Sequence, residues 1–373
     1  MTAEGAGPTA GGTAWAGHSA KELRRRVGDL SQLVSTRQIR LADGVEDGVR
    51  AIDVRVTGGL SALVLIDRGL DIGPAWAGGH QVSWQSTTGI VAPANLDETQ
   101  WLRAFHGGLM VTCGLQNVGP ACVDGGVAHG IHGRVSHTPA RNVTHRVVED
   151  PDGRLVAEVT GDVRETDVYG VDLVLHRTLR FPMGEPLVEI HDVVENLGYA
   201  PAGIMVLYHC NLGYPVVADG ARLLAPDAVV VPRDPPAAML LAEHATFPPP
   251  DETFDQLVYE HQLRDTAATS AWIGIANPGY APSGGIAVQV EYDPRQLPHL
   301  WQWRMLAPGM YLTGLEPATC GILGRDLEQE RGTVVSLAPG ERRRHDVTIR
   351  VTTGPAVAAL VEAYDRSRGG SAA

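Results

Sequence analysis

The sequence predicts an all-β fold, a large antiparallel β-sandwich with few short helices. Short stretches of alternating apolar and polar residues are separated by turns rich in Gly and Pro, of which the 373 residues contain 44 and 25. Helical patterns are few, and they do not alternate with the strands as a parallel sheet would require. No segment recurs at a fixed period, which disfavours a propeller.

The N-terminal part of the chain predicts a polar segment, one helix and then strands. Residues 1–20 are rich in Gly, Ala and Thr, and we expect them to be disordered. Residues 21–373 show no break in composition, so we expect a single sandwich domain, beginning with a helix over Lys21–Leu33. Gly-Gly pairs then separate three predicted strands, which cover Ala51–Val56, Ala62–Asp67 and the region near Asp71–Trp76.

Hairpin signals dominate the rest of the chain. Residues 142–165 alternate on both sides of an Asp-Gly pair, which predicts a hairpin. Residues 171–198 show the same pattern around "PMGEP", and residues 332–354 predict a last hairpin around "APGE". Residues 293–306 contain a turn, and residues 354–368 predict a C-terminal helix.

Composition excludes several classes of partner. The formal net charge is -13 without a long basic run, which argues against binding to nucleic acid or to an anionic membrane surface. No stretch approaches the roughly 18 apolar residues of a spanning helix, and the N-terminus lacks the apolar core of a secretory signal. The four cysteines form no CxxC pair, so no structural zinc site is expected. We therefore expect a cytoplasmic protein that binds a small molecule, and the oligomeric state is open.

Two motifs in the first third of the chain carry polar residues beside glycines. "RGLDIG" contains Arg68 and Asp71, which form either an internal ion pair of a turn or the rim of a pocket. "FHGGLMVTCGLQNVG" contains His106 followed by Gly-Gly, and then Gln116 and Asn117. Glycines allow a ligand to approach the backbone, and amide side chains can bind hydroxyl groups. A buried strand followed by a turn explains the same motif equally well.

The stretch "GGVAHGIHGRVSHTPARN" concentrates His129, His132, His137 and Arg134 among glycines. If Ala128–Arg134 is extended, His132 and Arg134 lie on one face, because side chains alternate along a strand. Two cationic groups on one face need a polar ligand or a carboxylate from elsewhere. We therefore predict that His132 and Arg134 line a cleft and that His137 belongs to a connecting segment.

Two later motifs supply an acid–base pair. In "VLYHCNLGYP", an extended chain places His209 and Asn211 on one face and Tyr208 and Cys210 on the other. This arrangement predicts a proton donor, His209, beside an amide that binds a substrate hydroxyl, Asn211. In "YLTGLEPATCGILGR", Glu316 ends an apolar strand and precedes a proline. Burial of such a carboxylate raises its pKa, which suits a general base. The upstream Trp303 either packs in the core or provides an aromatic face for a sugar.

Taken in order, "GGLMVTCGLQNVG", "HGIHGR…TPA", "YHCNLGYP" and "GLEPAT…GR" resemble the DUF4432 group of aldose 1-epimerase-like proteins, within the galactose mutarotase-like superfamily. The resemblance covers roughly residues 30 to 352. It implies a β-supersandwich with a carbohydrate cleft, and chemistry in which a carboxylate base and a histidine acid open the sugar ring so that it can close as the other anomer. It is much less specific for the substrate.

Carried over to this sequence, the resemblance makes Glu316 the base and His209 the acid. His132 and Arg134 would hold ring hydroxyls or the ring oxygen, and Arg325 of the last motif joins the predicted substrate contacts. Classical members have His-Gly-Gly where this chain has His132-Gly133-Arg134, so Arg134 would select an anionic or otherwise unusual sugar. The chemistry needs no cofactor.

Two alternatives stay open from the sequence. In the first, His129, His132, His209 and Glu316 bind a divalent metal in a sugar isomerase or lyase, because three imidazoles and a carboxylate are a common ligand set. His129 and His132 are spaced for one helix face rather than for one strand face. In the second, the protein binds a carbohydrate without turning it over, and Glu316→Gln would then have no activity to remove.

Overall fold

The structure, a computed structural model, describes residue 15, residues 17–93 and residues 101–369. Strands account for 48% of it and helices for 13%, which confirms the predicted all-β class. The predicted disordered segment 1–20 lies mostly outside the described residues. At its described end, Ser19 caps the first helix by accepting from the backbone N–H of Glu22.

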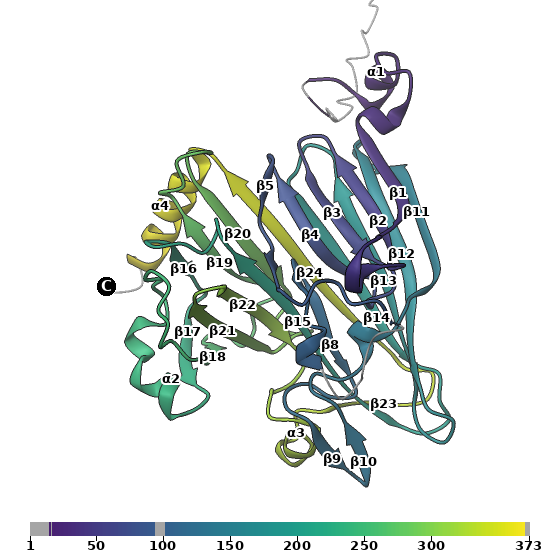
Figure 1. Cartoon of the computed structure of the whole chain (residues 1–373), viewed down its shortest axis with the longest axis vertical. Coiled ribbons are helices and arrows are strands. Elements are labelled where there is room, and N and C mark those ends of the chain that lie inside the picture. Colours follow the sequence, from purple (N-terminus) through teal and green to yellow (C-terminus); the bar gives the residue numbers. More distant parts are fainter. Residues whose placement is uncertain (1–14, 16, 94–100, 370–373) are drawn as a thin grey trace, which may run out of the picture.

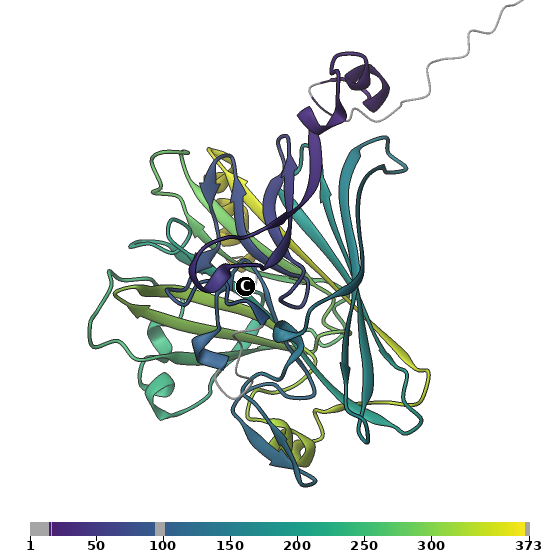
Figure 2. The same ribbon diagram turned by 45° about the vertical axis from the view of Figure 1, so that its right-hand side comes forward.

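Three large antiparallel sheets make up most of the fold (Figures 1 and 2). The eight-stranded sheet has the order β11 (Arg141–Glu149), β12 (Leu155–Thr166), β13 (Asp172–Pro182), β14 (Leu187–Asn196), β24 (Arg342–Thr353), β20 (Ile286–Tyr292), β19 (Ala271–Asn277) and β16 (Arg222–Leu224). The seven-stranded sheet has the order β17 (Ala228–Pro232), β18 (Leu257–Leu263), β21 (His299–Ala307), β22 (Met310–Ala318), β15 (Ala202–Gly213) and β23 (Val335–Leu337), with β8 (Val111–Leu115) also paired to β15.

The five-stranded sheet contains the N-terminal strands β1 (Val34–Arg40), β2 (Arg50–Val56), β3 (Leu60–Leu65), β4 (Asp71–Ala77) and β5 (His80–Gln81). Two small ribbons pair β6 (Trp84–Gln85) with β7 (Gly107–Gly108), and β9 (Cys122–Asp124) with β10 (Val127–His129). The helices are α1 (Ala20–Arg24), α2 (Pro235–Met239), α3 (Arg325–Arg331) and α4 (Ala356–Gly369), with short 3-10 turns η1 (Leu30–Gln32), η2 (Gly44–Glu46), η4 (Trp101–Arg103), η5 (Val135–His137) and η6 (Leu241–Glu243).

The main core lies between the eight-stranded sheet and the other two large sheets. Its buried cluster joins Val159, Leu175 and Ile349 of the eight-stranded sheet to Val64 of β3 and Val206 of β15. Burial of these alternating apolar side chains is the dominant force that holds the layers together. A second apolar cluster, which includes Met205 and Leu207 of β15, lies on the opposite face of the seven-stranded sheet. This outer face carries the candidate site.

The local strand predictions are largely confirmed. The three early strands correspond to β2, β3 and β4, and the two hairpins correspond to β11–β12 and β13–β14. The predicted C-terminal helix is α4, which packs beside β19 and β24. The predicted helix over Lys21–Leu33 is wrong: α1 ends at Arg24, and a separate turn η1 follows Gly28.

The last predicted hairpin is also wrong. β23 pairs with β15, whereas β24 pairs with β14 and β20, so the "APGE" turn carries the chain from one sheet to another. Gly340 donates its N–H to the carbonyl of Asn196, which attaches the turn to the end of β14. Among the described residues, no helix has the length and apolar character needed to cross a bilayer.

Candidate active site

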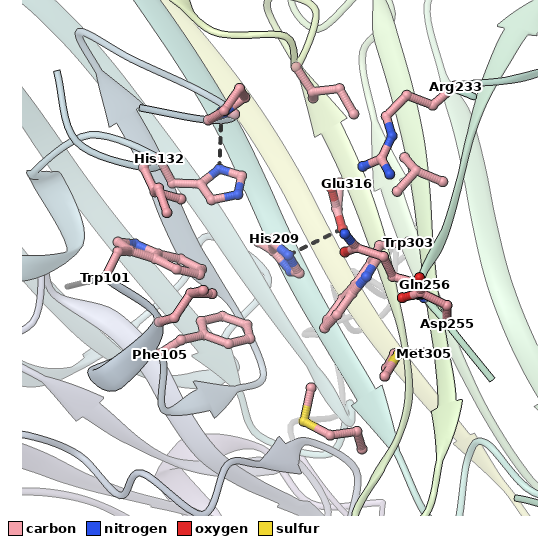
Figure 3. Close-up of a pocket in the computed structure, with 17 residues that line it drawn as sticks. Trp101, Phe105, His132, His209, Arg233, Asp255, Gln256, Trp303, Met305 and Glu316 are labelled. Atoms are coloured by element: carbon pink, nitrogen blue, oxygen red, sulfur yellow. Dashed lines mark hydrogen bonds and ion pairs between the residues drawn. The ribbon is translucent and has the colours of Figure 1, made fainter. Parts of the chain in front are cut away.

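A pocket of about 410 Å³ opens on the outer face of the seven-stranded sheet (Figure 3). Strands β15, β18, β21 and β22 form its floor, and segments after β6 and β10 form its wall. The polar or aromatic side chains that line it are Trp101, Phe105, His132, His209, Arg233, Asp255, Gln256, Trp303 and Glu316. The size lies within the range typical of sites for small organic ligands.

His209 reaches the pocket because of the two-residue period of β15. Tyr208 and Cys210 are fully buried in the main core, so His209 between them points to the outer face. Asn211 lies beside His209 as the parity predicts, but it does not line the pocket. Its amide donates to the backbone carbonyl of His209 at 2.9 Å, so its predicted contact with substrate is replaced by a supporting role.

Glu316 occupies the neighbouring strand β22, which continues to Ala318 instead of ending at the carboxylate as predicted. The register pairs Cys210 with Leu315 and brings the Nε2 atom of His209 to 3.3 Å from the Oε1 atom of Glu316. Gly314 makes this contact possible. A Cβ atom at Gly314 would lie 2.2 Å from Oε1 of Glu316, too close for a real contact, and 3.0 Å from Cε1 of His209, tighter than most real contacts.

Burial opposes charge on both members of this pair. It raises the pKa of Glu316 to about 8, while the nearby cation of Arg233 acts in the opposite direction. Burial lowers the pKa of His209 to about 3, with a further lowering by His132 and an opposing effect of the Asn211 side chain. Because burial disfavours the charged form of each group, Glu316 is protonated and His209 is neutral near neutral pH in the unliganded protein, and the pair holds one titratable proton.

His132 is held in the pocket in one defined orientation. The backbone N–H of Gly119 donates to Nδ1 of His132 at 3.3 Å, so in the neutral ring the proton is on Nε2. Burial lowers the pKa of His132 to about 4, which keeps the ring neutral. The residue has a φ of 54°, a conformation that is uncommon outside glycine. His132 therefore presents an N–H donor beside the ring of Trp101, whose centroid is 4.7 Å away.

The prediction that Arg134 shares a face with His132 is wrong. The left-handed backbone at His132 and Gly133 breaks the expected extended run, and Arg134 begins the turn η5. Its guanidinium forms ion pairs with Glu165 at 3.6 Å and Asp167 at 3.2 Å and does not line the pocket. The positive charge of Arg134 is thus paired with one carboxylate of β12 and one of the following turn, and not with a ligand.

Arg68 and Asp71 do not form the rim of the pocket as predicted. Asp71 is fully buried and accepts from Arg177 at 2.8 Å and from the hydroxyl of Thr112 at 2.6 Å. Arg177 also pairs with Asp192 at 2.7 Å. This buried network joins β4, β8, β13 and β14 beneath the site, so Asp71 supports the sheets instead of binding substrate.

Arg68 connects three backbone segments. Its guanidinium donates to the carbonyls of Ser136 at 2.9 Å, Val91 at 3.2 Å and Ala104 at 2.8 Å. Burial lowers its pKa to about 10, and among the described residues no carboxylate forms an ion pair with it. Through these hydrogen bonds, Arg68 connects the turn that follows His132 with the segment of the pocket wall that contains Phe105.

Replacing Arg68 by Met should lower the free energy of unfolding by about 3 kcal/mol, because three buried carbonyls lose a charged donor. Urea unfolding of the two proteins measures the difference. Arg146→Met is the matched control, since Arg146 is exposed and, within the part of the chain that the structure describes, its one ion pair is with Glu158; its loss should stay below about 1 kcal/mol. An Arg68→Met protein as stable as the control variant would contradict this role.

The other predicted substrate contacts, Gln116, Asn117, Arg325 and His106, are not among the residues that line the pocket. Gln116 donates to Glu165 at 2.7 Å, and Asn117 donates to the carbonyls of Pro120 and Gly130. Arg325 pairs with Asp124 at 2.9 Å and donates to two backbone carbonyls. His106 is buried beside Arg68 and does not line the pocket. These residues shape the loops around His132 and β8, which corrects their predicted role.

The predicted metal ligands are not brought together. His132, His209 and Glu316 line the pocket, but His129, at the end of β10, does not. Within residues 17–93 and 101–369, no group of three or more His, Cys, Asp or Glu side chains is arranged to hold a metal ion. The geometry thus offers a Glu–His pair with a second histidine as donor.

Of the polar or aromatic residues that line the pocket, Trp303 was predicted from the sequence. Five others were not: Arg233, Asp255, Gln256, Trp101 and Phe105. Trp303 packs against His209 with ring centroids 5.4 Å apart, as predicted for a pocket wall. Asp255 and Gln256 precede β18, and Arg233 follows β17. Exposed polar residues at strand ends carry no local signal of function, and only the pairing of β17 with β18 and of β18 with β21 brings these three to the pocket.

The comparisons with known proteins agree with this fold. The model of a family described as a domain of unknown function, DUF4432, matches residues 46–351. A proposed aldose 1-epimerase from Klebsiella pneumoniae subsp. pneumoniae has 25% sequence identity and a TM-score of 0.83, over 93% of this chain and 90% of that chain. No curated protein matches the sequence.

Two further solved structures are similar in fold at lower identity. A galactose mutarotase-like protein from Clostridium acetobutylicum has 13% identity and a TM-score of 0.58, over 86% of this chain and 99% of that chain. A galactose 1-epimerase from Lactobacillus acidophilus NCFM has 14% identity and a TM-score of 0.52, over 86% and 99%. These similarities confirm the galactose mutarotase-like architecture.

Proposed function

The chain belongs to the DUF4432 family, and from this premise and the geometry of the pocket we propose that it is an aldose 1-epimerase, which interconverts the anomers of a free sugar. The observation that carries the proposal is the contact of 3.3 Å between His209 and Glu316 at the base of the pocket. A buried carboxyl–imidazole pair that holds one titratable proton can accept a proton from one oxygen of the substrate and donate a proton to another.

The proposed reaction begins with a sugar whose anomeric hydroxyl reaches Glu316 and whose ring oxygen reaches His209. The proton of the pair moves to His209 as the sugar binds. Arg233 stabilises the carboxylate, and the Asn211 side chain stabilises the protonated imidazole. Glu316 then accepts the hydroxyl proton, His209 protonates the ring oxygen, and the bond between the anomeric carbon and the ring oxygen breaks. The product is the open-chain aldehyde.

The second half of the reaction reverses these transfers. After rotation next to the carbonyl carbon, the chain hydroxyl attacks the other face of the aldehyde. His209 takes the proton of that hydroxyl, and Glu316 returns a proton to the carbonyl oxygen. No atom is gained or lost, and the pair again holds one proton. The Nε2–H of His132 provides a neutral donor for a sugar oxygen, and Trp101 and Trp303 can pack on the apolar C–H faces of the ring.

The proposal is tested by anomer exchange, measured by NMR saturation transfer between the two anomeric protons across a panel of neutral and acidic aldoses. Acceleration for at least one sugar supports it. If no sugar in the panel exchanges faster than the blank while some sugars bind, the protein is a carbohydrate-binding protein instead, and the proposal fails.

The pair also predicts a specific pH dependence of kcat/KM, after subtraction of the uncatalysed rate. Activity requires one proton on the pair, so it should fall as the pH rises through the raised pKa of Glu316, about 8. A second proton binds only at low pH, because burial lowers the pKa of His209 to about 3. We therefore expect a plateau from about pH 5 to 7. A basic limb near the ordinary histidine pKa of about 6.5 would contradict the shared-proton state.

A further inference from the structure

The side chains that line the pocket change from polar to apolar along β21 and β22. The residues of β22 that share the face of Glu316 are Gly314, Leu312 and Met310, and those of β21 beside them are Trp303 and Met305. The register pairs Trp303 with Gly314 and Met305 with Leu312. The floor thus runs from a carboxyl group to two methionine side chains that line the pocket near the β21–β22 turn.

The opposite wall of this end is apolar as well. Phe105 lies across from Trp303, with ring centroids 6.3 Å apart, whereas Leu102, which also lines the cavity, is 67% exposed. Figure 3 shows Arg233 above Glu316, whereas Met305 lies below Trp303 and away from that cation. Figure 3 also places Asp255 and Gln256 beside Met305, so polar groups lie next to the His209–Glu316 pair and at the start of β18, whereas the apolar part of the pocket is formed by Phe105, Met305 and Met310.

Methionine and phenylalanine side chains provide no hydrogen bond that could replace the one between a sugar hydroxyl and water. A hydroxyl that enters such a region loses its hydrogen bonds, whereas a methyl or larger apolar group gains from leaving water. Methionine also adapts its shape to the group that it contacts. The aromatic rings alone would suit any sugar, but the two methionines favour a substrate with an apolar substituent.

We propose that the part of the pocket formed by Phe105, Met305 and Met310 is a subsite for an apolar substituent of the sugar. The substrate class is then an aldose with a free anomeric hydroxyl that carries, at a position remote from the anomeric carbon, a methyl or larger apolar group in place of a polar one. This inference rests on the proposed epimerase function for its catalytic readout, although not for its binding readout.

The test compares sugars that differ only by a methyl group in place of a hydroxymethyl group. Suitable pairs are D-fucose with D-galactose, L-rhamnose with L-mannose and D-quinovose with D-glucose. In at least one pair, kcat/KM for anomer exchange should be about 10-fold or more higher for the deoxy sugar, the discrimination expected from one apolar contact. Equal values, or a preference for the hydroxylated sugar in every pair, would overturn the subsite.

The variant Met305→Gln/Met310→Gln keeps the approximate side-chain length and should reduce the preference to less than about 3-fold. Met239→Gln is the matched control, because Met239 is 80% exposed on α2, and it should keep the wild-type preference. A preference that survives in the double variant would show that these methionines do not form the subsite.

Failure of the subsite can be separated from failure of the epimerase proposal. Equal exchange rates within every pair contradict the subsite alone, whereas absence of exchange for every sugar contradicts the proposed function. In the latter case the affinities of the same pairs, measured by quenching of tryptophan fluorescence, still decide the question, since Trp101 and Trp303 line the pocket. Tighter binding of the deoxy sugar supports the subsite, and equal or weaker binding overturns it.

Discussion

Replacing Glu316 by Gln is expected to lower the rate of enzyme-catalysed anomer exchange by about 10²–10⁴-fold, the usual contribution of one general acid–base group. Glutamine has nearly the same shape but cannot take a proton from the anomeric hydroxyl. NMR saturation transfer at one pH, on wild type and variant at equal concentration, measures the effect. Unchanged thermal unfolding and sugar binding would show that the loss is chemical.

The chain offers a closely matched control for Glu316→Gln. Glu260 on β18 of the same sheet also contacts a histidine, with 2.7 Å between its Oε1 and Nδ1 of His299, but neither residue lines the pocket. Glu260→Gln should leave the exchange rate within about 2-fold of wild type, as for a change outside the reacting groups. Equal losses in the two variants would indicate a general effect on the fold and would contradict the role of Glu316.

Replacing Gly314 by Ala is the second change with a large expected effect. The new methyl group would need the space that Glu316 and His209 now occupy, 2.2 Å and 3.0 Å from their nearest atoms. The carboxyl group must then shift from its observed position. A displacement of about 1 Å in an active site can cost about 10²-fold in rate, so we expect a loss of that order in saturation-transfer measurements.

Gly279→Ala separates this effect from the general cost of replacing glycine. A Cβ atom at Gly279 meets only the Oδ1 atom of Asn277, at an ordinary 3.6 Å, and its backbone is outside the left-handed region. This control should retain wild-type exchange. Full activity of Gly314→Ala would show that the observed contact between the His209 and Glu316 side chains is not needed.

The parts of the site that were predicted correctly follow from local rules. The two-residue period of an extended chain is enough to place His209 and Asn211 opposite Tyr208 and Cys210 on β15. It cannot give the register between β15 and β22, which brings Glu316 to His209 across about a hundred residues of sequence. The family resemblance supplied that pairing, and the geometry is consistent with it.

The incorrect predictions have two physical causes. Left-handed backbone at His132 and Gly133 interrupted a run that alternation alone would have kept extended, and it turned Arg134 away from the pocket. Long-range partners explain the wrong assignment of Asp71, because it is paired by Arg177 of a different sheet. A charged residue in a turn cannot be recognised as buried until that distant partner is known.

The measurement that bears most directly on the paired role of His209 and Glu316 is a double-mutant cycle of anomer exchange. The variants are His209→Asn, Glu316→Gln and the double variant, measured with wild type on the same sugar. Residues that act as one unit show strongly non-additive losses. We predict that the double variant is no slower than the slower single variant by more than about 3-fold. Losses that multiply would show that the two side chains act independently and would contradict catalysis by a shared-proton pair.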